Sequence, residues 1–391
     1  MYSIADYGLM IGDRVRMDAF HRALRQAVRP GCTVVDIGTG TGIFALLACQ
    51  AGAGRVYAIE PDDAIQVARE VARANGVADR IEFIQAASTT VTLPERADVI
   101  VSDIGGILPW FRHHIPSIID ARRRFLSPGG VLIPQQDRAW AAVVDAPELY
   151  ARDTAAWREN TFGLDMEAAR RLVVNTIDKG RVSPEQLLTR PEVWATVDYR
   201  RVEDVHVRAR ISQTVERDGI GHGFVAGFDR VLLDGIELSN APDAPDGMRP
   251  QRIYGTLFFP WPEATSLHAG DPVTIELEAT LVAADYVWSW KTDVCNRDEP
   301  SRVKASFEQS TFFGAPLAAS RLRKRSAAYR PRLSAEGGMT RIVLEAMHAG
   351  TPLGQIAEQL AARFAERFKG PLEALHYVAD ISEQYSAGEE P

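Results

Sequence analysis

Short apolar runs alternate with helical patterns over the first third of the chain. Between these runs, apolar residues recur at helical spacing, and such alternation predicts a parallel, doubly wound sheet with helices on both faces. Before the first run, Met10, Val15, Phe20 and Leu24 fall near one face of a helix that Pro30-Gly31 ends. The strands we expect are Thr33–Ile37, Arg55–Ile59, Ile81–Gln85, Ala97–Ser102 and Val131–Ile133.

Beyond Pro134 the pattern changes: helical patterns surround Leu149–Trp157 and Met166–Val174, and period-two runs follow from about Val193 to Trp290. Val205–Ile211 and Val273–Ala279 alternate apolar and polar residues, as strands with one buried face do. Turn residues such as Asp234-Gly235 and Asp246-Gly247 separate these runs, so we expect an antiparallel sheet that forms a barrel or a sandwich. From about residue 331 the pattern is helical again.

The patterns therefore predict an α/β protein with a Rossmann-like doubly wound parallel sheet, an antiparallel β-barrel and a small C-terminal helical domain. A chain of 391 residues is long enough for two or three domains. The expected divisions are covering helices (1–30), a Rossmann-like domain (31–137), a barrel (138–300) with an arm at about 150–180, a linker (301–330) and a helical domain (331–391).

Composition and charge exclude several classes of function. A hydrophobic fraction of 46% fits a globular protein with a buried core, and a net charge of −8 argues against a general affinity for nucleic acid or anionic membranes. The N-terminus lacks the pattern of a signal peptide, and no apolar segment approaches the roughly 20 residues needed to cross a bilayer. Three widely spaced cysteines make neither a disulfide framework nor a metal site, so we expect a soluble, cytoplasmic protein without a metal.

The strongest local signal is the segment from Val34 to Gly42, in which a buried strand enters a glycine-rich turn that opens a helix. Glycine allows a tight bend and lets a ligand approach the backbone, while the helix N-terminus offers free N–H groups. Asp36 precedes the first glycine by two residues. Glu60 ends the next expected strand, where a carboxylate can accept hydrogen bonds from both hydroxyls of a ribose.

A dinucleotide-binding site is the competing interpretation of this turn. Its G-x-G-x-x-G spacing differs from the G-x-G-x-G found here, and an anionic pyrophosphate would be repelled by Asp36. The cationic end of S-adenosylmethionine would be attracted by the same acid. Ser127-Pro128-Gly129-Gly130 before a strand is also frequent in methyltransferases. We therefore predict S-adenosylmethionine as cofactor and S-adenosylhomocysteine as product.

Several motifs in the same order resemble the protein arginine methyltransferases. Met10–Arg16 resembles M-L-x-D-x-x-R, whose arginine binds the cofactor carboxylate, and Ser88 with Thr89 falls where that family contacts adenine. Trp157–Met166 resembles the region leading into an arm that pairs subunits, and Phe224–Asp229 resembles a barrel strand. The resemblance implies a Rossmann-like domain, a β-barrel and a head-to-tail homodimer. The candidate cofactor residues are Met10, Arg16, Asp36, Gly38, Thr39, Gly40, Gly42, Ile43, Glu60, Pro61, Ala87, Ser88 and Asp103.

The loop that would hold the methyl acceptor departs from this family. The family binds a guanidinium with two glutamates, whereas here Asp103 replaces the first and Arg112 stands where the second should be. Arg252 also replaces the histidine of the family's T-H-W loop. A guanidinium about 4 Å from Arg112 would be repelled by about 4 kcal/mol at an effective dielectric constant near 20, which puts arginine as substrate in doubt. In the alternative, Arg112 points outward or pairs with Asp103.

Methyl transfer needs an acceptor atom with a free lone pair. An α-amine or an imidazole loses its proton more easily than a lysine amine does, so an amine or imidazole is the acceptor we expect, with a carboxylate next. The candidate catalytic residues are Asp103 first, to orient or deprotonate the acceptor, then His113 and His114, with Arg112 beside them. Each histidine has a structural role as its alternative.

The C-terminal segment resembles another family. Gly337–Met347 followed by Ala349–Leu360 is similar to the helical part of small PqqD-like domains. The resemblance implies capture of the leader peptide of a ribosomally made natural product, commonly by strand addition. Winged-helix and plain three-helix modules share this pattern, so a structural cap on the barrel remains the alternative.

Three functions follow from these observations. The first is methylation of a peptide, a natural-product precursor or a protein, at an amine, imidazole or guanidine nitrogen, with the leader held by residues 331–391. The second is a methyltransferase for small-molecule natural products. The third is a binding subunit that keeps the scaffold with an altered acid loop, although Arg16, Asp36 and Glu60 would then have no purpose.

Overall fold

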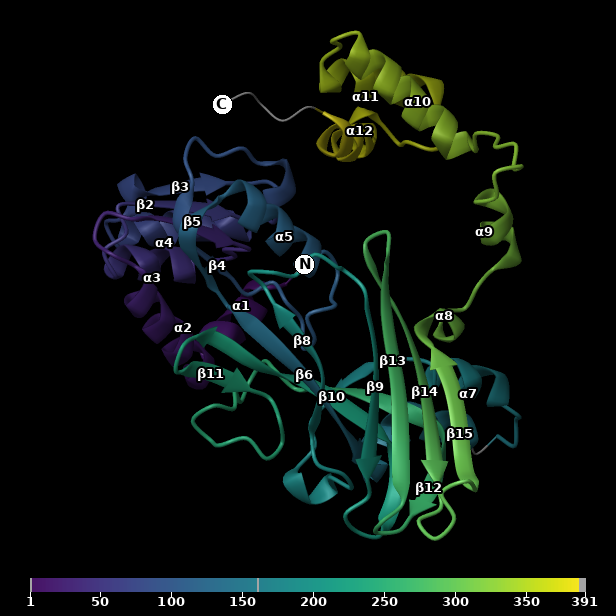
Figure 1. Cartoon of the computed structure of the whole chain (residues 1–391). Helices are drawn as coiled ribbons and strands as arrows, with labels where there is room; N and C mark the ends of the chain where they lie inside the picture. The colour runs from purple at the N-terminus through teal and green to yellow at the C-terminus, as the bar shows by residue number, and fades with distance from the viewer. Residues whose placement is uncertain (1, 160–161, 387–391) are drawn as a thin grey trace. The chain divides into compact units, whose positions relative to one another are not determined.

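The computed structural model describes residues 2–159 and 162–386. The chain divides into two compact units, residues 1–316 and 317–391 (Figure 1). Asn160 and Thr161, which lie in the segment that resembles the subunit-pairing region, fall outside the described residues.

A five-stranded parallel sheet opens the first unit, with the strand order β3-β2-β1-β4-β5. The central strand β1 (Thr33–Ile37) pairs with β2 and β4, so that the carboxyl ends of these three strands lie side by side. The other strands are β2 (Arg55–Ile59), β3 (Ile81–Ile84), β4 (Ala97–Ser102) and β5 (Leu126–Ile133), and the helices between them are α3 (Ile43–Gln50), α4 (Ala64–Ala74) and α5 (His114–Arg124), with 3-10 turns at Ala78–Arg80 and Ser88–Thr90. The predicted parallel sheet is confirmed.

The expected N-terminal helix is two helices, α1 (Ile4–Ile11) and α2 (Arg14–Ala27). Asp13 separates them because its side chain accepts a hydrogen bond from the backbone N–H of Arg16 and caps α2. The two helices differ in burial. α2 buries its apolar side chains, with Phe20 stacked on Phe44 of α3, whereas α1 has no buried side chain.

Two antiparallel sheets complete the first unit, as the period-two pattern predicted. The six-stranded sheet contains β7 (Asp178–Gly180), β12 (Thr256–Leu267), β10 (Gly219–Leu233), β6 (Gln136–Val144) and β8 (Glu192–Asp198), with β11 (Ile236–Ser239) on β10. The four-stranded sheet contains β15 (Val303–Ser310), β14 (Asp285–Cys295), β13 (Pro272–Val282) and β9 (Val207–Thr214). The remaining elements are α6 (Pro147–Arg158), α7 (Glu167–Val173), the 3-10 turn Pro184–Gln186 and α8 (Thr311–Gly314).

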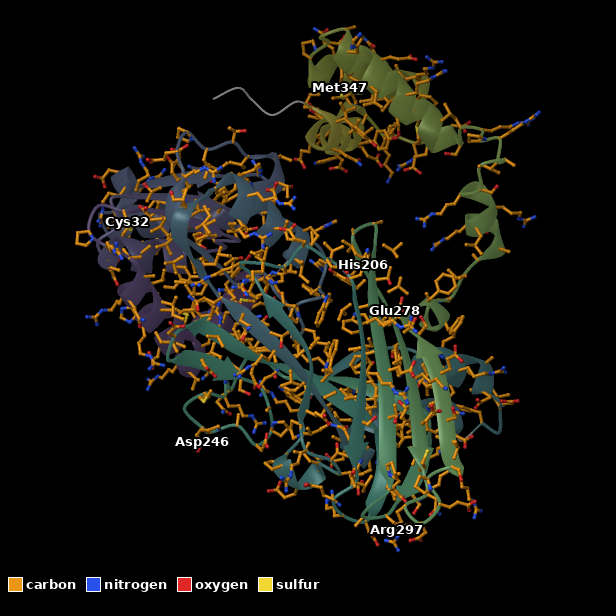
Figure 2. The ribbon with its side chains drawn as sticks, viewed as in Figure 1. Cys32, His206, Asp246, Glu278, Arg297 and Met347 are labelled. Atoms are coloured by element: carbon orange, nitrogen blue, oxygen red, sulfur yellow. The ribbon has the colours of Figure 1, made fainter. Side chains whose placement is uncertain are left out.

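The two antiparallel sheets face each other in a barrel-like arrangement. Phe259 of the six-stranded sheet packs its ring at near right angles to Trp290 of the four-stranded sheet, with centroids 5.2 Å apart. Turns close the strands where the sequence predicted them: Asp234-Gly235 joins β10 to β11, and Asp246 lies in the loop between β11 and β12 (Figure 2).

The prediction of a linker over residues 301–330 is wrong for the first half of that range. Residues 303–310 form β15, which pairs along β14, and α8 follows directly. Ser310 fixes this end because its backbone N–H donates to the side chain of Asn175. The division between the units therefore falls after residue 316.

The second unit is helical, with its own apolar core. It contains α9 (Ala319–Lys324), α10 (Ala335–His348), α11 (Leu353–Arg363) and α12 (Pro371–Tyr385). Met339, Val343, Ile356, Leu360 and Val378 bury their side chains against one another, as the helical spacing predicted. Between residues 317 and 386 the structure has no strand, so the expected strand addition has no sheet edge within this unit.

Candidate functional site

A cavity of about 1420 Å³ opens in the first unit, at the carboxyl ends of β1, β2 and β4. One end, the cofactor end, is lined by α1, α2 and the loops after these strands. The other, the acceptor end, is lined by the loop 103–113 and the antiparallel sheets. The sequence-predicted residues that line the cavity are Met10, Arg16, Gly38, Thr39, Ile43, Glu60, Pro61, Ala87, Ser88, Asp103, Arg112, His113 and His114.

The glycine-rich turn has the conformation that its sequence requires. Gly38 has a φ of +73°, and a Cβ added there would lie 2.2 Å from the side chain of Ile104. Its backbone N–H and that of Thr39 both donate to the carbonyl of Ile59, which fixes the turn to the end of β2.

Asp36, Gly40 and Gly42 do not line the cavity, contrary to their place among the candidate residues. Asp36 is fully buried below the turn, where one oxygen accepts from the Thr39 hydroxyl at 2.6 Å and from the Ala45 N–H at 3.0 Å. Burial raises the pKa of this carboxyl to about 7, because a charge there loses its hydration. Asp36 therefore shapes the turn and does not face a ligand.

Glu60 is fixed at the end of β2 and faces the cofactor end. Its two carboxylate oxygens accept backbone hydrogen bonds from Gly40 and Asp62, each 3.0 Å long. A carboxylate offers about four acceptor positions, so two remain for a ligand. This geometry suits the paired hydroxyls of a ribose.

Arg16 lies between the two ends of the cavity. Its guanidinium packs over the rings of Phe20 and Phe44, 5.3 Å and 5.0 Å from their centroids. Two of its nitrogens, Nε and Nη2, bind Asp103 Oδ2 at 2.8 Å and 2.7 Å, and Nη1 donates to the Met10 carbonyl at 3.3 Å.

Asp103 is held from three sides. Besides Arg16, Arg230 Nη1 binds Asp103 Oδ1 at 2.7 Å, and the Tyr254 hydroxyl donates to the carboxylate at 2.6 Å. Arg230 in turn binds Asp137 through Nε and Nη2, both at 2.8 Å. Burial opposes the charge of Arg230, but Asp137, Tyr254 and Asp103 outweigh it and raise the Arg230 pKa. Asp103 is therefore part of a buried ion-pair network and is not free to orient or deprotonate an acceptor.

The two neighbouring histidines have different surroundings. His114 is buried, and its Nε2 lies 3.0 Å from the hydroxyl of Tyr199, which donates to Asp137 at 2.7 Å. Burial and the charge of Arg230 lower the His114 pKa to about 4, so it is neutral near pH 7. His113 is exposed at the rim. Of the two, His113 has the access to solvent that a proton acceptor needs.

Arg112 is exposed and stacks on the ring of Phe111, 5.2 Å from its centroid. Its φ of +45° lies in the left-handed region, which is unusual for a residue with a side chain. Within the described residues it forms no ion pair. The alternative in which Arg112 points outward fits this geometry, and pairing with Asp103 does not.

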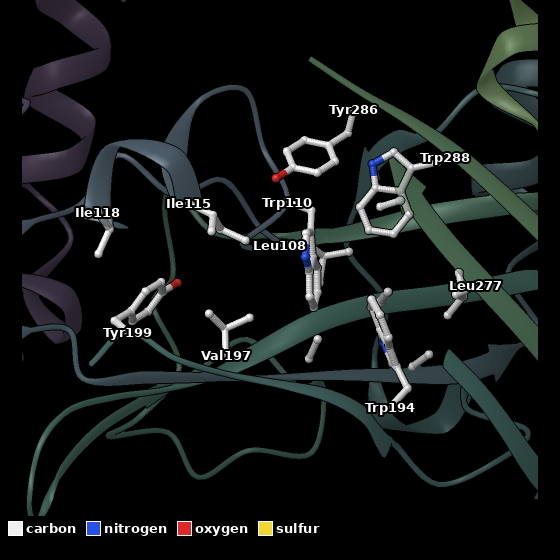
Figure 3. Packing of buried hydrophobic residues seen from close by; sticks show 14 of the residues in the cluster. Leu108, Trp110, Ile115, Ile118, Trp194, Val197, Tyr199, Leu277, Tyr286 and Trp288 are labelled. Atoms are coloured by element: carbon white, nitrogen blue, oxygen red, sulfur yellow. The ribbon is translucent and has the colours of Figure 1, made fainter. Parts of the chain in front are cut away.

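Aromatic side chains anchor the loop 103–113 to the antiparallel sheets. Trp110 stacks on Trp194 of β8 with centroids 5.0 Å apart and meets Trp288 of β14 edge-on (Figure 3). Trp110, Trp288 and Tyr286 also line the cavity, so the acceptor end has an apolar, aromatic wall.

Sequence reasoning missed Tyr7, Arg230 and Asp137. Tyr7 on α1 lies against Gly40, since a Cβ added there would be 2.4 Å from the Tyr7 ring. Arg230 and Asp137 are paired directly across β10 and β6. The sequence does show one charged residue in each of two apolar strands, which could have indicated a buried ion pair. The sequence does not show the strand register, which places the two residues opposite each other.

The comparisons with known proteins agree with this fold. A model of the ribosomal protein L11 methyltransferase (PrmA) family matches residues 21–137. Protein arginine N-methyltransferase PRMT10 of Oryza sativa subsp. japonica is 33% identical over 304 residues, covering 68% of this chain and 78% of the relative. The probable protein arginine N-methyltransferase 6 of Arabidopsis thaliana is 32% identical over 256 residues, and the match spans 57% of its length.

Solved structures share the fold. The crystal structure of Arabidopsis thaliana protein arginine methyltransferase 10 aligns with a TM-score of 0.68 at 23% identity, over 79% of this chain and 98% of that chain. The Trypanosoma brucei PRMT1 enzyme-prozyme heterotetrameric complex with AdoHcy aligns with a TM-score of 0.70 at 19% identity, over the same shares. From its sequence match to the rice enzyme and from its fold, this chain belongs to the protein arginine N-methyltransferase family of S-adenosylmethionine-dependent methyltransferases.

Proposed function

We propose that this chain transfers a methyl group from S-adenosylmethionine to a nitrogen of a protein or peptide. One observation carries the proposal: Glu60 faces the cavity with both oxygens oriented by backbone N–H groups and two acceptor positions left over. Family membership supports the reaction type, and the cavity volume of about 1420 Å³ supports a second substrate beside the cofactor.

The residues at the cofactor end fit this cofactor. Glu60 would accept from the ribose hydroxyls, and the backbone near Ala87 and Ser88 would border the adenine. Arg16 would bind the cofactor carboxylate, a role that the family resemblance implies. When bound, S-adenosylmethionine supplies the methyl group. The acceptor nitrogen uses its lone pair for the new N–C bond while the C–S bond breaks with its electrons left on sulfur, and the proton then lost from nitrogen passes to solvent.

Calorimetry with S-adenosylhomocysteine and transfer of a radiolabelled methyl group to a panel of peptides test this function. We expect binding of S-adenosylhomocysteine and label in a peptide. If the protein binds no S-adenosylhomocysteine, or binds a nicotinamide nucleotide instead, the proposal is wrong.

More narrowly, we propose a natural-product precursor peptide as the substrate, with residues 331–391 of the second unit as its docking segment. The separate helical core of this unit supports an independent role. Because it has no strand between residues 317 and 386, docking would use its helical surfaces. If a precursor is methylated at an unchanged rate after deletion of the unit, the peptide does not dock there. Methylation of free small molecules would instead favour a methyltransferase for small-molecule natural products.

A scaffold subunit is the alternative that the geometry of Asp103 favours, since this carboxylate is already occupied by Arg16 and Arg230. One structural relative is an enzyme-prozyme heterotetramer.

The head-to-tail homodimer through the arm at about 150–180 also stays a proposal, and light scattering at several concentrations tests it. The free thiols of Cys32, Cys49 and Cys295 support the cytoplasmic location that we propose.

A further inference from the structure

The segment that opens the second unit is strongly basic. We call residues 317–335, which include α9, the basic segment (Figure 1). It contains six cationic side chains and no acid, and the nearest acids in the chain are Glu308 and Glu336. Without these six cations the formal net charge of the chain would change from −8 to −14. The six residues are Arg321, Arg323, Lys324, Arg325, Arg330 and Arg332.

These six charges are not neutralised within the part of the chain that the structure describes. All six side chains are exposed, and among residues 2–159 and 162–386 none of them forms an ion pair. The ion pairs described in the second unit join Arg341 to Glu345 and Arg367 to Glu373, outside the basic segment. The basic segment is therefore free to bind an external anion.

The cations of α9 are crowded on one side of the helix. Arg321 precedes Lys324 by three residues and Arg325 by four, the spacings at which side chains on a helix are neighbours. Like charges at these spacings repel one another. Carboxylates bound alongside would lower this repulsion, and guanidinium groups can bind them through two parallel hydrogen bonds.

The basic segment begins close to the cavity along the chain. Ala315 lines the cavity, and Leu317 follows two residues later. The end of α8 is tightly packed, since a Cβ added at Gly314 would lie 2.5 Å from the backbone oxygen of Asn175. Ten residues of chain lead from Ala315 to Arg325 and span at most about 35 Å. A ligand bound by the segment is thus tethered to the cavity, which raises its effective concentration there.

An acidic peptide suits this segment better than a nucleic acid does. Leu317, Leu322 and Leu333 are 52–65% exposed among the cations and can contact the apolar side chains of a peptide. Nucleic acid bases stack on aromatic rings, and the segment has one, Tyr329. The negative charge of the whole chain also repels a long polyanion.

We propose that the basic segment binds an acidic stretch of the peptide or protein that this chain methylates. This inference rests on the proposed methyltransferase function and adds a recognised feature of its substrate. The acidic stretch is separate from the acceptor nitrogen, so the proposal holds for each of the acceptors considered above. Binding remote from the reacting atoms that is equal in the ground state and the transition state lowers KM and leaves kcat unchanged.

Binding of two labelled peptides to the full chain tests the partner. The peptides have one length and the same leucines, and differ in having Glu or Gln at every second position. Fluorescence anisotropy at about 0.05 M salt should show the Glu peptide binding about tenfold more tightly, with a smaller advantage at 0.15 M salt. Equal affinity for the two peptides would overturn the proposal. Tighter binding of an oligothymidylate with the same number of charges would also overturn it, in favour of nucleic acid.

Two fourfold variants locate the binding. The first neutralises the cations around α9, which has no buried side chain whose loss would unfold the unit. The second neutralises four other exposed cations of the second unit and changes the net charge equally. The first variant is Arg321→Gln with Arg323→Gln, Lys324→Gln and Arg325→Gln, and the second is Arg341→Gln with Arg363→Gln, Arg367→Gln and Lys369→Gln. Affinity for the Glu peptide should fall about tenfold in the first and less than about twofold in the second. Equal losses would mean that the segment has no specific role.

Methyl transfer measures the consequence for the reaction. A peptide that takes up label is compared with the same peptide extended by the Glu stretch. In the wild-type protein the extension should lower KM about tenfold at constant kcat, and in the first fourfold variant this decrease should disappear. An extension without effect on KM contradicts the proposal. Absence of S-adenosylhomocysteine binding would instead overturn the proposed function, and the anisotropy of the Glu peptide is read independently of it.

Discussion

The two ends of the cavity use their carboxylates in opposite ways. At the cofactor end, Glu60 is oriented by two backbone N–H groups and keeps acceptor positions for a ligand. At the acceptor end, Asp103 is bound by two arginines and a tyrosine, and its positions are filled from within the protein. A carboxylate that lines a cavity therefore indicates ligand binding only when its hydrogen-bond partners within the protein leave acceptor positions free.

The largest effect that we expect comes from breaking the network at the acceptor end. Arg230→Met alone should lower the free energy of unfolding by about 3–5 kcal/mol, because it leaves Asp137 charged, buried and without its cation. Urea unfolding followed by tryptophan fluorescence measures this loss. Arg138→Met, with its partly exposed partner Glu237, should cost less than about 1 kcal/mol, and equal losses would show that the buried pair has no special weight.

The buried acid below the glycine-rich turn should produce a pH dependence of stability. The pKa of Asp36 is raised to about 7 by burial, so the folded protein binds a proton more tightly than the unfolded chain does. Its contribution is fully present below about pH 4 and is lost as the pH rises toward 7. Between pH 5 and pH 7 the free energy of unfolding should fall by roughly 2 kcal/mol for this group. Asp36→Asn should remove that part of the pH dependence, and an identical profile in the variant would contradict the assignment.

Removing the charge at the cofactor end should weaken ligand binding without unfolding the protein. Glu60→Gln should reduce the affinity for S-adenosylhomocysteine by about thirtyfold, or about 2 kcal/mol, since two hydrogen bonds to a charged acceptor are weakened. Calorimetry measures the change. Glu70→Gln on α4 is the control because Glu70 is exposed and pairs with Arg73 of the same helix. Unaltered affinity in Glu60→Gln would mean that the ligand does not use this carboxylate.

The smallest effect concerns the second unit. Truncation after residue 316 should leave the affinity for S-adenosylhomocysteine unchanged within about twofold, because the described residues that line the cavity lie in the first unit. The same calorimetric titration tests this. A larger loss of affinity would show that residues 317–391 support the cofactor end of the cavity. The comparison between the cofactor end and the acceptor end would then have to include these residues.

Local sequence patterns were enough to predict the cofactor end. The strand, turn and helix around Gly38 and the acid at Glu60 depend on neighbours in the chain, and their spacing carries the information. The acceptor end depends on residues far apart in sequence. Asp103 and Arg230 are separated by 127 positions, and their contact follows from how the antiparallel strands pair. Asp36 was expected to attract the cationic end of the cofactor, but its carboxyl is fully buried. The sequence pattern gives no measure of that burial.

The helix α1 has a consequence for the speed of the reaction. None of its side chains is buried, yet Tyr7 from this helix lies over Gly40 at the edge of the cavity. A segment with so little buried surface detaches at low cost, while a ligand beneath it must wait for that detachment before it can leave. The product would then leave only as fast as α1 detaches, and where that step limits turnover, kcat falls as solvent viscosity rises while the methyl-transfer step keeps its rate.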